Sequence, residues 1–334
     1  MPASLHRSLL GLALPGGAGA RLSVLGYHRV LPQPDPLLGG DPTAEEFTRT
    51  MEWVKDAFNV VALADGVAAL QRGTLPKRAL AITFDDGYAN NETLAAPVLQ
   101  RLGLPATFFI ATGFLDGGRM FNDTVVEAVR AAQGEELDLG SLGLDRYRIV
   151  TLADRRSAVA SILGGIKYRT LTERVALAEE IAERAGAQLP RDLMMTSEQA
   201  ARLANMGFEL GGHTVNHPIL ARLGEADARR EINENRLRLA ELAGRPARFF
   251  AYPNGSPGRD YTIETVRLLR EAGYEGAVTS SPGAARAGTD PFQIPRFTPW
   301  DTAPLRFTLR MMNNAVRVEP RLLSVRATTM TGTQ

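Results

Sequence analysis

Short apolar runs alternate with helical patterns along most of this sequence. Eight of the runs are rich in branched or aromatic residues and are bounded by Gly, Pro or Asp, which is typical of buried strands. We predict strands at residues 22–26, 60–63, 79–84, 107–111, 208–211, 248–252, 275–279 and 292–295. Because helical patterns lie between most of these runs, the sequence predicts an α/β fold with a parallel sheet, either open or closed as a barrel.

Several helices carry start and stop signals. Thr43 with Glu46, and Thr196 with Gln199, have the spacing of a capping box, which marks a helix start. Helices are also predicted at 226–243 and 262–272, and each is followed by a glycine that can end it.

Residues 117–193 break the alternation. They contain helical patterns, as at 157–163 and 171–185, but no strand signal, and the segment is too long for a loop in a compact domain. We therefore expect a helical insertion packed on the main domain. The predicted organisation is a lead-in segment at 1–20, a main domain at 21–316 that carries the insertion at about 117–193, and a C-terminal tail at 317–334.

The first twenty residues admit two interpretations. Arg7, an apolar run at 9–14 and small residues at 18–20 are similar to a signal peptide, but Gly11 and Pro15 interrupt and end the run. We favour a short amphipathic helix, and with it a protein of the cytoplasm or the membrane periphery. No stretch reaches the ~20 apolar residues of a membrane-spanning helix, so we predict no transmembrane segment.

Composition restricts the possible chemistry. The chain has no cysteine, which excludes disulfides, thiolate metal sites and cysteine nucleophiles. Its net charge is only +1, which argues against a nucleic-acid partner. Histidine-dependent chemistry must use the four histidines of the chain, His6, His28, His213 and His217.

Two adjacent carboxylates, Asp85 and Asp86, follow the strand predicted at 79–84 and precede Gly87. In parallel α/β folds the carboxyl ends of the strands face the active site. Neighbouring residues of an extended chain point in different directions, so the two carboxylates can have different roles. An Asx turn beside a helix start would also explain an isolated Asp-Asp-Gly.

His213 and His217 follow the strand predicted at 208–211. Their spacing of four places both imidazoles on one face of a helical turn. Two imidazoles with a carboxylate form a ligand set for Zn²⁺ or another divalent transition metal. We predict one divalent ion, with zinc first and cobalt, nickel or manganese as alternatives, held by His213, His217 and Asp86.

A third segment, Tyr252-Pro253-Asn254-Gly255, ends the strand predicted at 248–252. It is either a plain turn or a pocket wall whose backbone N–H near Asn254 faces a developing oxyanion.

These three segments, in this order, resemble the motifs of the polysaccharide deacetylase family, also called the NodB-homology or carbohydrate esterase family 4 fold, over about residues 22–298. The resemblance implies a distorted (β/α) barrel of about seven strands with a helical insertion. It implies that Asp85 is the general base. It assigns Asp86, His213 and His217 to the metal, and the Tyr-Pro-Asn-Gly turn to the substrate groove.

The sequence departs from the family pattern at two places. Ala251 stands near the family's Arg that braces the catalytic Asp, and Arg296, after the last predicted strand, is our candidate replacement. The family's last motif carries a His that acts as general acid, but no His follows His217. His28 is the candidate donor of the proton. The alternative is that His28 has a structural role and Asp85 alone shuttles the proton. The Tyr-His start resembles the branch that acts on extracellular poly-glucosamine.

The function implied is the metal-dependent removal of N-acetyl or O-acetyl groups from a polysaccharide or amino-sugar glycan, with the acetylated glycan as partner. Tyr88 and Tyr252 are candidates to pack on a sugar ring. Pro253, Asn254 and Arg296 complete the expected substrate site. Two alternatives stay open: hydrolysis of a small or lipid-linked amide or formamide on the same fold, and glycan binding by a catalytically inactive relative.

Overall fold

The computed structural model of the chain describes residues 3–298, 301, 303–317 and 323. The strands are β1 (Arg21–Tyr27), β2 (Asn59–Val60), β3 (Ala79–Phe84), β4 (Thr107–Ile110), β5 (Glu136–Asp138), β6 (Arg146–Arg148), β7 (Glu209–Gly212), β8 (Phe249–Ala251), β9 (Gly276–Val278) and β10 (Ala285–Arg286). The α-helices are α1 (Ala3–Ala13), α2 (Ala44–Ala57), α3 (Leu63–Gln71), α4 (Ala96–Leu102), α5 (Phe121–Ala131), α6 (Leu152–Ile166), α7 (Leu171–Arg184), α8 (Ser197–Asn205), α9 (Glu225–Ala243), α10 (Ile263–Glu271) and α11 (Pro304–Val316).

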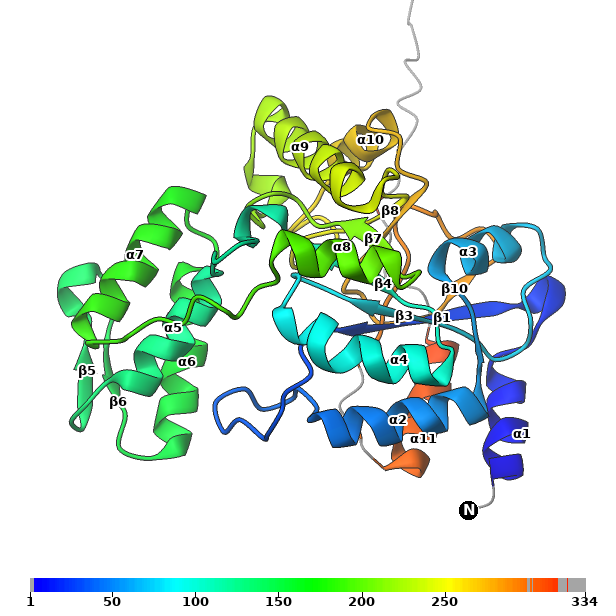
Figure 1. Cartoon of the computed structure of the whole chain (residues 1–334), viewed down its shortest axis with the longest axis horizontal. Helices are drawn as coiled ribbons and strands as arrows, with labels where there is room; N and C mark the ends of the chain where they lie inside the picture. Colours follow the sequence, from blue (N-terminus) through cyan, green and yellow to red (C-terminus); the bar gives the residue numbers. More distant parts are fainter. Residues whose placement is uncertain (1–2, 299–300, 302, 318–322, 324–334) are drawn as a thin grey trace, which may run out of the picture.

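The main sheet follows the order β10-β1-β3-β4-β7-β8-β9, and β2 pairs with the start of β3. Neighbouring strands along this path are parallel, except that β10 is antiparallel to β1. The seven strands of the path curl strongly into a half-barrel with helices on its outside (Figure 1). The predicted α/β fold, a distorted barrel of about seven strands, is confirmed.

The central strands are buried on both faces, which explains why they appear in the sequence as continuous apolar runs. In β3, Leu80 and Ile82 belong to the core beneath the outer helices, whereas Ala79 and Ala81 belong to a second core shared with residues of other strands. Side chains of a strand alternate between its two faces, so each run supplies both cores.

The gap between β9 and β1 is spanned by residues 292–297. Ile294 makes a single parallel bridge to Val278 of β9, and Phe297 makes one to Leu25 of β1. The prediction of a regular strand at 292–295 is wrong, because the segment crosses the gap with only one bridge on each side. β10 was not predicted, since two residues give no periodic pattern.

Residues 117–193 lie beside the main sheet and have their own hydrophobic core, which includes Val129, Ile162 and Ile181 (Figure 1). They contain α6 and α7, which cover the predicted helical patterns, and a further helix, α5. The segment is mostly helical, but it also contains two strands for which we found no sequence signal: β5 and β6 form an antiparallel hairpin. Its three-residue strands, Glu-Leu-Asp and Arg-Tyr-Arg, are too short and too charged to give a strand signal. Among the described residues, neither strand pairs with the main sheet.

The lead-in segment contains the favoured helix, α1, which packs against α11 and α2. Leu10 and Leu14 are buried, and His6 Nδ1 lies 2.8 Å from Thr308 Oγ1. The predicted tail at 317–334 lies outside the described residues except at two positions. In the described ranges no helix has both the length and the apolar character needed to cross a bilayer.

Candidate active site

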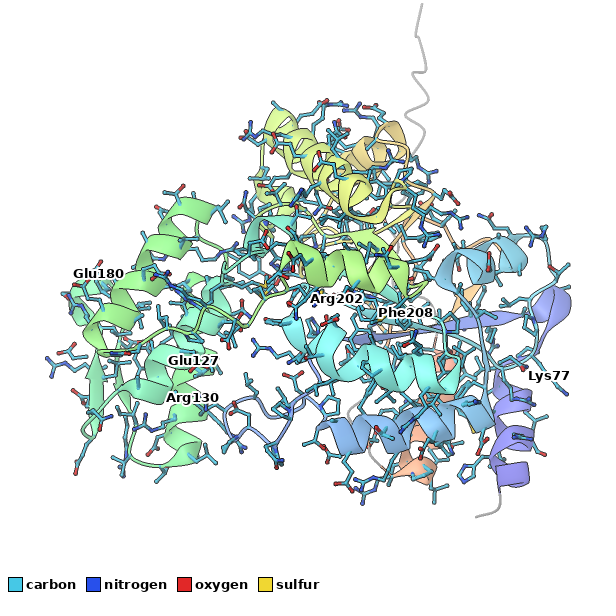
Figure 2. All side chains as sticks on the ribbon, viewed as in Figure 1. Lys77, Glu127, Arg130, Glu180, Arg202 and Phe208 are labelled. Atoms are coloured by element: carbon cyan, nitrogen blue, oxygen red, sulfur yellow. The ribbon has the colours of Figure 1, made fainter. Side chains whose placement is uncertain are left out.

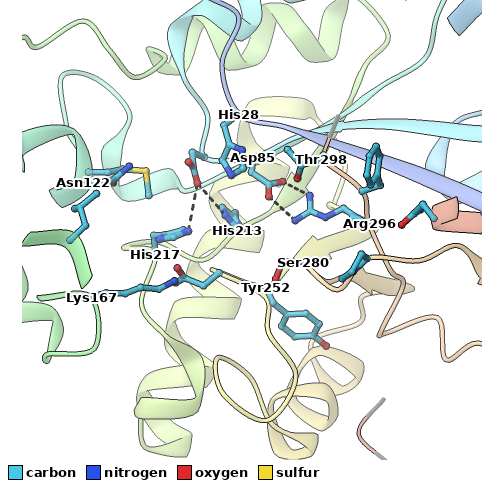
Figure 3. A pocket seen from close by; sticks show the side chains of 18 of the residues that line it. His28, Asp85, Asn122, Lys167, His213, His217, Tyr252, Ser280, Arg296 and Thr298 are labelled. Atoms are coloured by element: carbon cyan, nitrogen blue, oxygen red, sulfur yellow. Dashed lines mark hydrogen bonds and ion pairs between the residues drawn. The ribbon is translucent and has the colours of Figure 1, made fainter. Parts of the chain in front are cut away.

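The carboxyl ends of the parallel strands open into one cavity of about 720 Å³. The cavity lies between the main sheet, the insertion helices α5 and α6, and the C-terminal helix α11 (Figure 3). Eight of the ten predicted site residues line it: His28, Asp85, Asp86, His213, His217, Tyr252, Asn254 and Arg296.

The Asp-Asp-Gly turn directs its two carboxylates apart. Asp86 and Gly87 both have a positive φ, of 75° and 93°, so the chain turns sharply at the end of β3. A non-glycine residue in this region is uncommon and often marks a functional turn. Backbone hydrogen bonds fix the turn: Asp85 N donates to Tyr27 O at 2.9 Å and Ala111 N donates to Asp86 O at 3.1 Å.

Asp85 forms a bidentate ion pair with Arg296. Arg296 Nη1 and Nη2 each lie 2.6 Å from an oxygen of Asp85, and both side chains are buried. Arg296 Nε in turn donates to the carbonyl of Thr279 at 3.0 Å. Burial raises the pKa of Asp85, but the charge and hydrogen bonds of Arg296 outweigh it, and the pKa lies below its usual range. The expected contact of Arg296 with Asp85 is therefore present, and Asp85 is ionised at neutral pH.

The three predicted metal ligands come together. Nε2 of His213 and Nε2 of His217 lie 3.3 Å and 3.6 Å from Asp86 Oδ1, and ligand atoms of all three residues lie within 4.8 Å of one another. Ligands at about 2.0–2.1 Å from a tetrahedral Zn²⁺ are about 3.3 Å apart, so this spacing fits the ion. His213 Nδ1 contacts the carbonyl of Ala251 at 2.6 Å, which leaves Nε2 free to coordinate.

The electrostatics of the three side chains also suit a cation. Burial, and then the charge of His213, lower the pKa of His217 to about 3, so this imidazole is neutral, as a metal ligand must be. Burial lowers the pKa of His213, but Asp86 and Asp85 outweigh it and raise the pKa above its usual value. The two carboxylates thus stabilise positive charge at this point. The donor set and its electrostatics fit one divalent ion, whose identity they do not select.

The histidine pair does not lie on a helical turn, as its spacing predicted. Residues 213–217 form an irregular loop in which Thr214 and His217 have positive φ values of 64° and 51°. The histidines approach each other because the loop folds back on itself, with His217 N donating to Thr214 Oγ1 at 3.0 Å. Their ring centroids are 4.7 Å apart.

Two residues of α9 hold this loop in place. Glu231 accepts hydrogen bonds from the backbone N–H groups of Val215 and Asn216, each at 2.8 Å. Asn235 accepts one from His213 N at 3.1 Å and donates to the carbonyl of Ile110 at 2.9 Å. The sequence analysis missed both residues. Their spacing of four on a predicted helix was the available signal, but the many other charged residues of α9 obscured it.

His28 faces the same cavity from the end of β1 (Figure 3). Its side chain is exposed, and its ring makes no hydrogen bond with any residue that the structure describes. Its charge is close enough to lower the pKa of both Asp85 and Asp86. A role restricted to bonding the backbone at the strand end therefore has no support here.

Three expected substrate contacts need correction. Tyr88 is only 2 % exposed and lies away from the cavity lining, where Arg29 stacks on its ring and burial raises its pKa to about 12. Pro253 is a buried turn residue whose carbonyl accepts from Gly255 N at 2.8 Å. Tyr252 lines the cavity, but Tyr261 covers one face of its ring with centroids 3.8 Å apart, so Tyr252 is mainly a core residue.

Comparison with known proteins identifies one family. The profile of the family described as "Polysaccharide deacetylase" matches residues 72–163 and 170–277, more than half of the chain. The protein YxkH of Bacillus subtilis strain 168, provisionally named a polysaccharide deacetylase, is 21 % identical over 271 residues, which are 80 % of this chain and 67 % of YxkH.

Solved structures share the fold. The deacetylase PplD of Streptococcus pyogenes, solved in complex with acetate, is 17 % identical with a TM-score of 0.59, over 88 % of this chain and 99 % of that one. IcaB from Ammonifex degensii is 20 % identical with a TM-score of 0.58, over 90 % of this chain and 98 % of that one. The family match, the shared fold and the Asp-His-His group together show that the chain belongs to the polysaccharide deacetylase family.

Proposed function

We propose that this protein is a metal-dependent hydrolase that removes acyl groups, N-acetyl groups in the first place, from an amino-sugar glycan. The observation that carries the proposal is the pairing of two neighbouring groups. A buried, ionised Asp85 with both oxygens bound to Arg296 lies directly beside the Asp86–His213–His217 group. The cavity that joins them has the size of a small-ligand site, which is about 300–1,000 Å³.

Each residue of the site has a distinct role in amide hydrolysis. A divalent cation held by Asp86, His213 and His217 supplies Lewis-acid activation of water and of the acyl carbonyl. Asp85 takes a proton from the water molecule while the water oxygen forms a bond to the acyl carbon. Arg296 keeps Asp85 ionised and fixes its orientation.

The leaving nitrogen must gain a proton when the C–N bond breaks. We assign this proton to His28, which faces the cavity and whose imidazole is free of hydrogen bonds to described residues. The products are a free sugar amine and acetate. If His28→Gln leaves the maximal rate and the basic limb of the pH–rate profile unchanged, Asp85 returns the proton and His28 has no part in the step.

Acetate release tests the proposal. The purified protein is incubated with Zn²⁺ and the pentamer of N-acetylglucosamine, and acetate is measured with and without a chelator. We expect release that the chelator abolishes. Release of formate from an N-formylated amino sugar without acetate release would move the substrate to formamides, and tight binding of the pentamer without release would indicate an inactive glycan-binding relative.

A further inference from the structure

The insertion places a lysine at the active-site cavity. Lys167 follows the last residue of α6 and lines the cavity. Arg174 of α7 donates to the carbonyl of Lys167 at 3.5 Å and to the carbonyl of His217 at 3.1 Å, so Lys167 lies beside the histidine loop. Its side chain extends toward the cavity on the side of His217, opposite Arg296 (Figure 3).

Lys167 belongs to a group of cations around one aromatic ring. The Nζ of Lys167 and the guanidinium carbons of Arg222 and Arg259 lie 5.5, 5.6 and 4.3 Å from the ring centroid of Tyr168. The hydroxyl of this ring has an acidic partner, Asp260, which accepts from Tyr168 Oη at 3.3 Å. We call Lys167, Arg222 and Arg259 the Tyr168 cluster.

The Tyr168 cluster is not neutralised by ion pairs. Three arginines also line the cavity: Arg296 pairs with Asp85 and Arg310 with Asp301, whereas Arg317 makes no ion pair with any described residue. The three members of the Tyr168 cluster make no ion pair with any residue in the described part of the chain. Burial lowers the pKa of Lys167, and the charges of Arg259 and Arg174 lower it further, although Asp260 opposes them. Lys167 is the member of the cluster that lines the cavity, and it carries this positive charge to the end of the cavity beside His217.

We propose that Lys167, reinforced by the charges of Arg222 and Arg259, binds a negatively charged group of the substrate, a carboxylate or a phosphate, carried next to the acylated sugar amine. This inference rests on the proposed function and names the substrate class of the same site. Each deacylation of a poly-glucosamine chain creates an ammonium group, and a polycationic product would be repelled by these side chains. An acidic glycan or a sugar phosphate keeps a group that pairs with them.

Amine labelling measures the binding without turnover. The chain has three lysines, Lys55, Lys77 and Lys167, so an acylating reagent gives three lysine sites, which mass spectrometry separates from one another and from the N-terminal amine. The metal-free protein is labelled with N-acetylglucosamine 1-phosphate, N-acetylmuramic acid or neutral N-acetylglucosamine present. We expect the phosphate or the carboxylate probe, but not the neutral one, to slow labelling of Lys167 several-fold. Lys55 and Lys77 serve as internal controls, and Lys77 lies far from the insertion (Figure 2).

Turnover separates this proposal from the proposed function. In the metal-loaded protein, Lys167→Met should lower the ratio of kcat/KM for an anionic over a neutral acetylated substrate by about tenfold, as expected for one charge-assisted contact. Lys167→Arg should retain most of the ratio, Arg259→Met should lower it, and Lys77→Met is the matched control.

The outcomes are distinguishable. Equal protection by neutral and anionic probes, or a ratio unchanged by Lys167→Met, overturns the anion subsite while leaving deacylation intact. Selective protection of Lys167 in a protein that releases no acetate supports the subsite and contradicts the proposed function.

Discussion

At the scale of single residues, the two neighbouring carboxylates differ through their partners. Asp85 is bound by a guanidinium, whereas Asp86 faces two imidazoles. Their position after a buried strand indicated that the two carboxylates could have different roles, and the resemblance to the family implied which role belongs to which residue. The positive φ of Asp86, which turns the side chains apart, is not encoded in any periodic pattern.

We expect Asp85→Asn to keep metal binding and to lose turnover by about 10²–10⁴-fold, since this change removes the general base but no metal ligand. Calorimetric titration with Zn²⁺ and the rate of acetate release measure the two effects. Asp192→Asn, at an exposed position, is the matched control. Turnover within threefold of the parent would contradict the role assigned to Asp85.

Arg296→Met should lower the free energy of unfolding by about 3–5 kcal/mol, because it leaves the buried carboxylate of Asp85 without a counter-charge. Adding Asp85→Asn to that variant removes the uncompensated charge, so the double variant should be more stable than Arg296→Met alone. Urea denaturation of the parent, the two single variants and the double variant measures this coupling. If the two changes were simply additive, the ion pair would not have the importance that its geometry indicates.

The substrate residues show where single-residue prediction fails. Tyr88 lies three residues after Asp85 but points toward Asp123 of α5, with Oη 3.3 Å from both carboxylate oxygens. That partner belongs to the insertion, 35 positions along the chain. Lys167 likewise reaches the cavity only because the insertion folds back on the site. Neither placement follows from local spacing.

At the scale of elements, helix starts were the most predictable feature. The capping boxes at Thr43 and Thr196 are both present, and α9 ends at Gly244 with a φ of 67°. Their signals are local, because each hydrogen bond joins residues three positions apart. The histidine loop depends instead on Glu231 and Asn235 of another element, and for this reason the local spacing predicted a helical turn that the structure does not contain.

The last residues of β7 can tolerate no side chain. A Cβ on Gly211 would clash with the ring of Phe109, and one on Gly212 would clash with the hydroxyl of Tyr274. We expect Gly211→Ala to lower the free energy of unfolding by about 1–3 kcal/mol and to weaken metal binding, because it displaces the strand that carries His213.

Gly11→Ala is the control for that variant. Gly11 lies inside α1, where an added Cβ meets open space, so alanine should raise the free energy of unfolding by about 0.5–1 kcal/mol. Chemical denaturation measures both changes. Equal stability of the Gly211→Ala variant and the parent would show that the strand can shift without cost.

At the scale of the whole molecule, the insertion and the main domain build the site together. The insertion is attached by ion pairs from the segment that follows β1, Arg29 to Asp123 and Asp35 to Arg130. Arg130 faces this segment across the junction (Figure 2). The sequence predicted a helical insertion and its approximate position. It could not predict the contacts, which join residues about 95 positions apart.

The Asp35–Arg130 ion pair should make the attachment of the insertion to the main domain depend on pH. Burial raises the pKa of Asp35, but Arg130 and the Leu37 N–H outweigh it, so the pKa in the folded protein lies below the unfolded value of about 3.9. The pair therefore stabilises the protein above that value, and its contribution is lost as pH falls through the folded pKa.

We expect Asp35→Asn to lower the free energy of unfolding at pH 7 by about 0.5 kcal/mol, discounted for partial exposure, and by progressively less below pH ~4. Urea midpoints at pH 7 and pH 3 measure the difference, with Asp192→Asn as control. If Asp35→Asn lowered the free energy of unfolding as much at pH 3 as at pH 7, the charge of Asp35 would not be the cause of the loss.

The central claim is that Asp86, His213 and His217 hold one divalent ion that the chemistry beside Asp85 requires. The most direct test titrates metal-stripped protein with Zn²⁺ while acetate release from the N-acetylglucosamine pentamer is followed. The account predicts no release without metal, and a rate that rises with added Zn²⁺ and levels off at one equivalent per chain. Acetate release that persists in the metal-stripped protein would contradict the account, and so would acetate release that is unchanged in the triple variant Asp86→Ala, His213→Ala, His217→Ala.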